Sequence, residues 1–237
     1  MQDLSPYQQF AKDVLKVEFN DLTLLVTAFT HRSYVNEHKK TVRVHNERME
    51  FLGDAVLELA VTEYLYSTYN EPEGILTNWR SALVRTESIG AAAVKYNFEP
   101  LLRLSRGEKR GTGRARLQIL ANSYESVVGA LYLDQGFEAA REFIKNSLLS
   151  TLPEILETGS WMDPKSHLQE LAQSSEGFTP IYKVLEEDGP DHDKIFVIGA
   201  FVNGVLRGKG HGPSKQIGQQ MAAEEALDYY KSVVPTE

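Results

Sequence analysis

Three carboxylates share one face of a segment that is otherwise apolar. Glu47, Glu50 and Asp54 are separated by three and four residues, so a helix turning about 100° per residue would align them. Their neighbours are mostly hydrophobic: Met49, Phe51, Leu52, Ala55, Val56, Leu57, Leu59 and Ala60. Carboxylates beside a hydrophobic core cost folding free energy unless a positive charge neutralises them. The pattern therefore predicts that a divalent cation binds along this stripe.

A second polar pair lies in another apolar segment, residues 119–132. Asn122 and Glu125 are three residues apart, which makes them neighbours on one face of a helix. Two buried helices that both present oxygen ligands can converge on one site, and ligands of this kind favour Mg²⁺ or Mn²⁺ over zinc. We therefore expect one metal site built from both segments.

A basic stretch directly precedes this second pair. Six cationic side chains and a single acid, Glu108, lie between residues 103 and 116. The cationic residues are Arg103, Arg106, Lys109, Arg110, Arg114 and Arg116. The glycines among them favour a flexible loop, and we expect Lys109 and Arg110 to contact phosphates. A solvated surface loop without a ligand is the alternative.

The composition excludes several other classes of chemistry. The 237 residues include no cysteine, so disulfides, thiolate metal sites and cysteine nucleophiles are excluded. No apolar run is long enough to span a membrane, and the first residues lack the layout of a signal peptide. We therefore expect a cytoplasmic protein without a membrane partner. The net charge of −8 argues against nucleic-acid binding by overall charge but is compatible with local basic patches.

The elements that would hold these residues change in type along the chain. Apolar residues recur at helical spacing at 8–18, 22–29, 46–69, 78–96, 117–133 and 137–149. One helix start is expected near Thr77, and residues 151–163 are expected to form a short connector. After a helix at 164–176, alternating residues predict strands at 181–187, 194–202 and 203–210, with a turn at Asn203-Gly204. A final helix is expected from about Ser214 to Lys231.

The segment Glu47–Asp54 resembles the defining motif of the ribonuclease III family. The segments Thr30–Tyr34, Glu73–Thr77 and Ile119–Ser126 show the same likeness. Residues 164–231 resemble the double-stranded RNA-binding domain of bacterial members. The resemblance implies a mostly α nuclease domain at 7–155, a linker at 156–163, and a small α+β domain of order α-β-β-β-α at 164–233.

The implied activity is hydrolysis of phosphodiester bonds in double-stranded RNA. Glu50, Asp54 and Glu125 match the family's acidic metal positions, with Asp54 and Glu125 in catalytic roles and Mg²⁺ (Mn²⁺ as a substitute) activating the attacking water. Glu47 and Glu73 match further acidic positions that would support the site or RNA contacts. A homodimer formed through the nuclease domain would make staggered cuts that leave 5′-phosphate and 3′-hydroxyl ends. Substrates would be precursors of ribosomal RNA and structured messenger or transfer RNA precursors.

Position 122 departs from the family pattern, because asparagine stands where aspartate is usual. An amide oxygen can ligate Mg²⁺ but brings no charge, so we expect weaker metal binding. Two interpretations are open. In the first, the enzyme works with asparagine at position 122. In the second, Asn122 is an inactivating replacement. The second interpretation gives the alternative function, a catalytically silent dimeric protein that binds double-stranded RNA. The retained carboxylates favour the enzyme, in which Asn122 would be a metal ligand.

The resemblance also implies RNA contacts in three parts of the second domain. They are Gln169 and Glu170 on its first helix, His192 in the turn between the first two strands, and Lys215 and Gln216 at the start of its last helix. Such domains recognise the shape and 2′-hydroxyls of an A-form duplex.

The last helix carries one basic residue where the family usually has two. Gly218 also weakens this helix, by up to about 1 kcal/mol. We therefore expect modest RNA affinity from the isolated domain.

Overall fold

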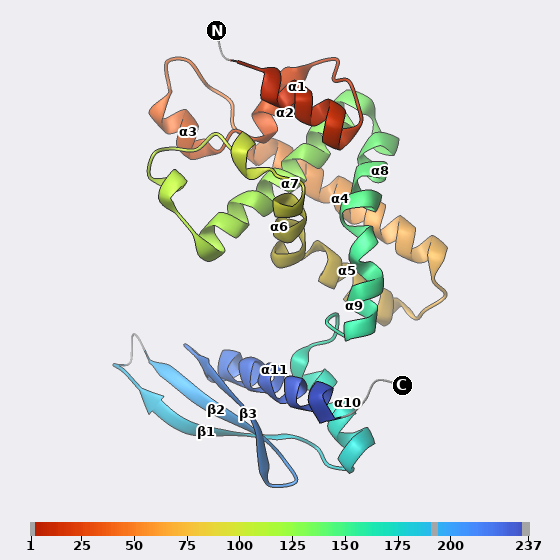
Figure 1. Cartoon of the computed structure of the whole chain (residues 1–237), viewed down its shortest axis with the longest axis vertical. Coiled ribbons are helices and arrows are strands. Elements are labelled where there is room, and N and C mark those ends of the chain that lie inside the picture. Colours follow the sequence, from red (N-terminus) through yellow and green to blue (C-terminus); the bar gives the residue numbers. More distant parts are fainter. Residues whose placement is uncertain (1–2, 191–193, 234–237) are drawn as a thin grey trace. The chain divides into compact units, whose positions relative to one another are not determined.

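The computed structural model describes residues 3–190 and 194–233, in two compact units that divide after Glu157 (Figure 1). The first unit is built from helices: α1 (Ser5–Phe10), the π-helical η1 (Ala11–Leu15), α2 (Leu22–Ala28), α3 (Arg32–Glu37), α4 (Glu47–Thr68), α5 (Glu73–Val84), α6 (Thr86–Lys95), α7 (Gly113–Gln135), α8 (Phe137–Ser147) and α9 (Leu152–Thr158). Short 3-10 turns lie at Glu99–Leu101, Glu108–Arg110 and Leu149–Thr151. Across these described ranges, none of the helices has the length and hydropathy needed to cross a membrane.

The two long helices α4 and α7 approach each other at a pair of glycines. A Cβ atom on Gly53 would lie 1.8 Å from the carbonyl oxygen of Glu125, and one on Gly129 would lie 2.5 Å from that of Met49. The backbones are therefore in direct contact, which only glycine permits. This contact brings the start of α4, with Glu50, next to the middle of α7.

The expected helix at 46–69 is confirmed by α4, but the expected helix at 78–96 is two helices. The chain is extended at Arg85 (φ −67°, ψ 152°) and divides α5 from α6. Ser88 Oγ donates to the carbonyl of Ala82 at 2.7 Å across this break. No glycine or proline marks the break, so apolar spacing alone does not reveal it. Similarly, α5 begins at Glu73 rather than near Thr77.

Two further helices were not expected from the sequence. α3 is short and carries no buried residue, so it has no apolar period to detect. α9 occupies part of the expected connector at 151–163, and it buries Leu152 and Ile155 against the helical core.

The second unit confirms the predicted α-β-β-β-α order. It comprises α10 (Pro164–Glu176), β1 (Ile181–Asp188), β2 (Ile195–Val202), β3 (Val205–Gly212) and α11 (Lys215–Val233). The antiparallel sheet has the order β1-β2-β3, and the β2–β3 turn is the predicted Asn203-Gly204 pair, both with positive φ (49° and 75°). Ile198, Ala200 and Val202 on β2 join the core formed with α10 and α11.

Close packing explains two of the glycines in this unit, Gly210 and Gly218. A Cβ on Gly210 would lie 2.2 Å from the backbone nitrogen of Ala222, so β3 and α11 touch through their backbones. A Cβ on Gly218 would lie 2.6 Å from Cγ1 of Ile198. The helix-weakening glycine at 218 therefore has a packing role that the sequence alone did not indicate.

Candidate active site

The carboxylates expected from the sequence meet where α4 and α7 touch. Glu50 and Glu125 are partly buried, and Asp54 is exposed. Burial, together with the charges of Asp54 and Glu50, raises the pKa of Glu125 to about 8. Burial also raises the pKa of Glu50, helped by the charges of Glu47 and Asp54. The charges acting on both carboxyls are negative, so the site has unneutralised negative potential.

Asn122 belongs to this group through its side-chain amide. The amide hydrogen-bonds the carboxylate of Glu50, and this bond opposes the rise in the pKa of Glu50. Gln118 Nε2 donates to Asn122 Oδ1 at 2.7 Å. An ionised aspartate could not donate to Glu50 and would add another negative charge. In the absence of a cation, Asn122 therefore stabilises a site that aspartate would destabilise.

The chemistry of these side chains suits a hard divalent cation. Carboxylate and amide oxygens are the ligands that Mg²⁺ and Mn²⁺ prefer, and a cation would relieve the repulsion that raises these pKa values. Within residues 3–190 and 194–233, no three histidine, aspartate or glutamate side chains already have a metal-binding arrangement. The carboxylates of Glu50, Asp54 and Glu125 would therefore have to turn toward a bound cation.

Glu47 borders this group but is held by basic neighbours. Arg32 Nη1 lies 3.3 Å from Glu47 Oε1, and His45 Nδ1 lies 3.8 Å from Oε2. The charge of Glu47 still acts on Glu50. This placement is consistent with a supporting position beside the site.

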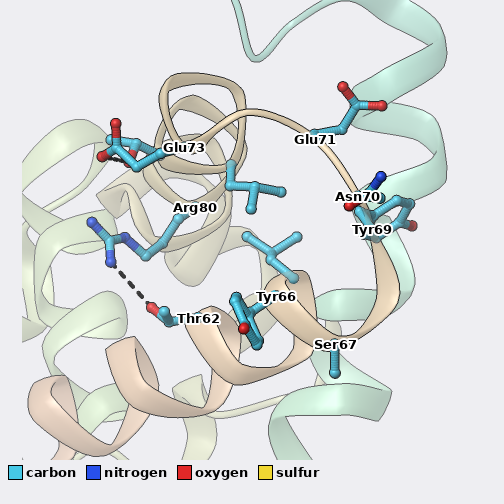
Figure 2. A pocket seen from close by; sticks show the side chains of 11 residues that line it. Thr62, Tyr66, Ser67, Tyr69, Asn70, Glu71, Glu73 and Arg80 are labelled. Atoms are coloured by element: carbon cyan, nitrogen blue, oxygen red, sulfur yellow. Dashed lines mark hydrogen bonds between the residues drawn. The ribbon is translucent and has the colours of Figure 1, made fainter.

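Glu73 lies in a pocket that Glu50, Asp54 and Glu125 do not line. It accepts a hydrogen bond from Thr77 Oγ1 at 3.1 Å and lines a pocket of about 760 Å³. Figure 2 shows it on the same side of that pocket as Arg80, which donates to Thr62 Oγ1 at 3.1 Å and pairs with Glu58 at 3.2 Å. Glu73 is not among the charges that shift the pKa values of the site carboxyls.

Two arginines of the basic stretch have structural partners within the helical unit. Arg116 Nη2 donates to the carbonyls of Glu108 and Lys109 at 2.9 and 3.0 Å. Arg103 Nη1 donates to Thr30 Oγ1 at 3.0 Å. α7 also begins at Gly113, within the stretch predicted as a loop. Lys109 and Arg110 lie on the 3-10 turn and are exposed, as a phosphate contact requires.

The proposed RNA contacts of the second unit lie on its surface where the structure describes them. Gln169 and Glu170 are exposed on α10, and Gln216 is exposed on α11. Lys215 is also exposed, but its Nζ lies 3.4 Å from Glu187 Oε1. This partner on β1 could not be inferred from sequence, because it depends on how β1 lies beside α11. His192 lies outside the described residues.

The metal-free protein is expected to lose stability as the pH rises from about 5 to about 8. The pKa of Glu125 is about 8 in the folded protein against 4.5 for an ordinary glutamate. Between these values the folded state keeps a proton that the unfolded state has released, so the free energy of unfolding falls with rising pH. Thermal unfolding in EDTA measures this. In Glu125→Gln, the Tm should fall less steeply with rising pH. An equally steep fall in that variant would contradict the attribution of the pH dependence to Glu125.

Comparison with known proteins identifies both units. A family model described as Ribonuclease-III-like matches residues 21–152, and the double-stranded RNA binding motif matches residues 164–230. Ribonuclease 3 of Enterococcus faecalis is 43% identical over 220 residues, which cover 91% of this chain and 94% of that protein. Ribonuclease 3 of Streptococcus pneumoniae is 42% identical over 222 residues, covering 93% and 95%.

Solved structures agree for the helical unit. The nuclease domain of ribonuclease III from Campylobacter jejuni matches with a TM-score of 0.52 and 36% identity, covering 59% of this chain and 96% of that domain. A second structure of the same domain gives a TM-score of 0.51 and 34% identity, covering 65% and 96%. Both domain models match in the expected order, and the relatives align over nearly their full length. The chain therefore belongs to the ribonuclease III family of endoribonucleases that act on double-stranded RNA.

Proposed function

We propose that this chain is a homodimeric, Mg²⁺-dependent enzyme that makes staggered cuts in double-stranded RNA and leaves 5′-phosphate and 3′-hydroxyl ends. Its nuclease domain would span 7–155 and its RNA-binding domain 164–233, joined by a linker at 156–163. It would act in the cytoplasm on ribosomal RNA precursors and on structured messenger and transfer RNA precursors. The observation that supports this most strongly is the group of mutually repelling carboxylates where α4 and α7 touch.

The side chains of this group would have separate roles in binding the metal and activating water. Glu50, Asp54, Glu125 and the amide oxygen of Asn122 would hold Mg²⁺ (or Mn²⁺). When bound, the cation would lower the pKa of a water molecule and neutralise charge on the scissile phosphate. Asp54, which is exposed, would orient the attacking water. Glu125 would release its proton on loading and complete the site from α7.

Exposed apolar side chains on α4 support the homodimer. Phe51 is 81% exposed, Leu59 is 57% exposed and Tyr66 is 81% exposed. Their spacing of eight and seven residues places them on one side of the helix. Large hydrophobic side chains on one exposed face are typical of an interface between subunits. Pairing two nuclease domains through this face would supply one site for each strand of the duplex.

The ends of the products test the proposed reaction. The protein should cleave a long RNA duplex in Mg²⁺ while leaving the same sequence as single-stranded RNA or as DNA duplex intact. The new 5′ ends should be ligatable without a kinase, and annealed products should carry short 3′ overhangs. Blunt products, or 5′-hydroxyl ends, would contradict the proposed dimeric reaction.

Asn122→Asp is expected to strengthen metal binding by about tenfold, because a fourth carboxylate adds charge to the ligand set. The same change should lower the Tm of the metal-free protein, since it removes the hydrogen bond to Glu50 and adds repulsion. Calorimetric titration with Mn²⁺ and thermal unfolding in EDTA measure the two effects. Wild-type protein that cleaves no duplex at saturating metal, with activity restored by Asn122→Asp, would instead support a catalytically silent natural protein.

A further inference from the structure

The side-chain amide of Asn122 lies between two neighbours that together fix its orientation. Gln118, one helical turn earlier on α7, has its Nε2 atom 2.7 Å from Asn122 Oδ1. On the other side, the carboxylate of Glu50 hydrogen-bonds the same amide. An ionised carboxylate only accepts hydrogen bonds, so Asn122 presents its nitrogen to Glu50 and its oxygen to Gln118. The two bonds require the same orientation of the amide and therefore reinforce each other.

This orientation is the reverse of the one that metal binding requires. An amide side chain binds a divalent cation through its oxygen, because its nitrogen serves only as a donor. In the structure it is the nitrogen of Asn122 that faces Glu50, one of the proposed metal ligands. For Asn122 Oδ1 to reach a cation shared with Glu50, the amide has to turn about χ2. That turn breaks the hydrogen bonds to both neighbours.

Gln118 opposes this turn. After it, Asn122 Nδ2 would face Gln118 Nε2, and two donors cannot form a hydrogen bond. The amide of Gln118 then has to turn as well, which its exposed position on α7 permits. An aspartate at position 122 would avoid this conflict, because one carboxylate oxygen could accept from Gln118 while the other bound the cation. The opposition to metal binding therefore depends on the combination of Gln118 with Asn122.

We propose that Gln118 is a positioning residue that holds Asn122 in its metal-free orientation, so that loading of the cation requires a coupled turn of both amides. The inference rests on the proposed function, which supplies the cation. The bond from Gln118 stabilises the metal-free site and weakens metal binding by the same amount. The site consequently fills at a higher cation concentration than it would without this bond.

Calorimetric titration with Mn²⁺ in the absence of RNA tests the proposal, with thermal unfolding in EDTA as a second measurement. Gln118→Met removes the donor but keeps a long side chain of similar helix propensity. This variant should bind Mn²⁺ about threefold more tightly, because one hydrogen bond no longer has to break. Its Tm in EDTA should be lower by about 1–3 °C. A purely structural role for Gln118 would lower the Tm without raising the affinity for Mn²⁺.

Two controls show whether the effect acts through the amide of Asn122. Gln118→Met in an Asn122→Asp background should not tighten Mn²⁺ binding, since either oxygen of a carboxylate can face the cation. Gln9 on α1 makes a similar bond, to the carboxylate of Asp13 four residues later. Gln9→Met should therefore bind Mn²⁺ with wild-type affinity.

The outcomes separate this proposal from the proposed function. Unchanged or weaker Mn²⁺ binding by Gln118→Met would overturn the proposal, and so would an equal gain in the Asn122→Asp background. Wild-type protein that binds Mn²⁺ but does not cleave duplex RNA would contradict the proposed function, while the Mn²⁺ affinities would still decide the role of Gln118. Wild-type protein that binds no Mn²⁺ would contradict both.

Discussion

Glu125→Gln is expected to reduce the kcat of duplex cleavage by about 10³-fold or more, while raising the Tm of the metal-free protein at about pH 8. Glutamine keeps the size of the side chain but removes the charge through which α7 would hold the cation. The same charge is unfavourable without metal, because burial and the charges of Asp54 and Glu50 raise the pKa of Glu125 to about 8. Loss of activity with a gain in stability is difficult to obtain from a purely structural role.

A matched substitution on α4 provides the control for this variant. Glu63 is exposed on the same helix as Glu50 and Asp54, and Glu63→Gln removes an equal charge. It should retain the wild-type kcat and the wild-type dependence of Tm on pH. Activity of Glu125→Gln within tenfold of wild type would contradict a metal-binding role for Glu125.

Gly53→Ala is expected to destabilise the protein by about 1–3 kcal/mol and to impair metal binding. The added Cβ would lie 1.8 Å from the carbonyl oxygen of Glu125, 2.6 Å from its carbonyl carbon and 2.9 Å from the backbone nitrogen of Gly129. These are backbone atoms, so no side-chain rotation relieves the clash, and α4 and α7 must separate. Alanine favours a helix by about 1 kcal/mol over glycine, and this gain only partly offsets the clash.

Gly74→Ala isolates the helix propensity from the packing effect. Gly74 lies in the first turn of α5, and a Cβ there would meet nothing within 4 Å. This variant should be as stable as wild type or slightly more stable. Urea unfolding compares the two variants, and Mn²⁺ titration follows the site. Equal stabilities would show that the contact between α4 and α7 tolerates a methyl group.

The sequence could predict which carboxylates lie together in the proposed site, because they are local in two helices. The spacing of Glu50 and Asp54, and that of Asn122 and Glu125, is enough to place each pair on one helix face. The hydrogen bond from Asn122 to Glu50 could not be predicted, since it depends on how closely α4 and α7 pack. That distance is determined by Gly53 and Gly129, whose roles become visible only when the helices are paired.

The basic stretch shows where sequence reasoning fails. Arg103 and Arg116 lie in the same basic, glycine-rich stretch as Lys109 and Arg110. In the structure, however, Arg103 and Arg116 hydrogen-bond to other residues of the protein. Composition shows that a basic side chain is present, but it does not show which group that side chain binds.

We expect the carboxylates between α4 and α7 to make cleavage of duplex RNA depend on a divalent cation. Titrating the rate of duplex cleavage against Mg²⁺, for wild type and Asp54→Asn, tests it most directly. The wild-type rate should rise from background in EDTA to saturation, whereas Asp54→Asn should stay near background throughout. Wild-type cleavage that is unchanged in EDTA, or equal rates in the two proteins at saturating Mg²⁺, would contradict the claim.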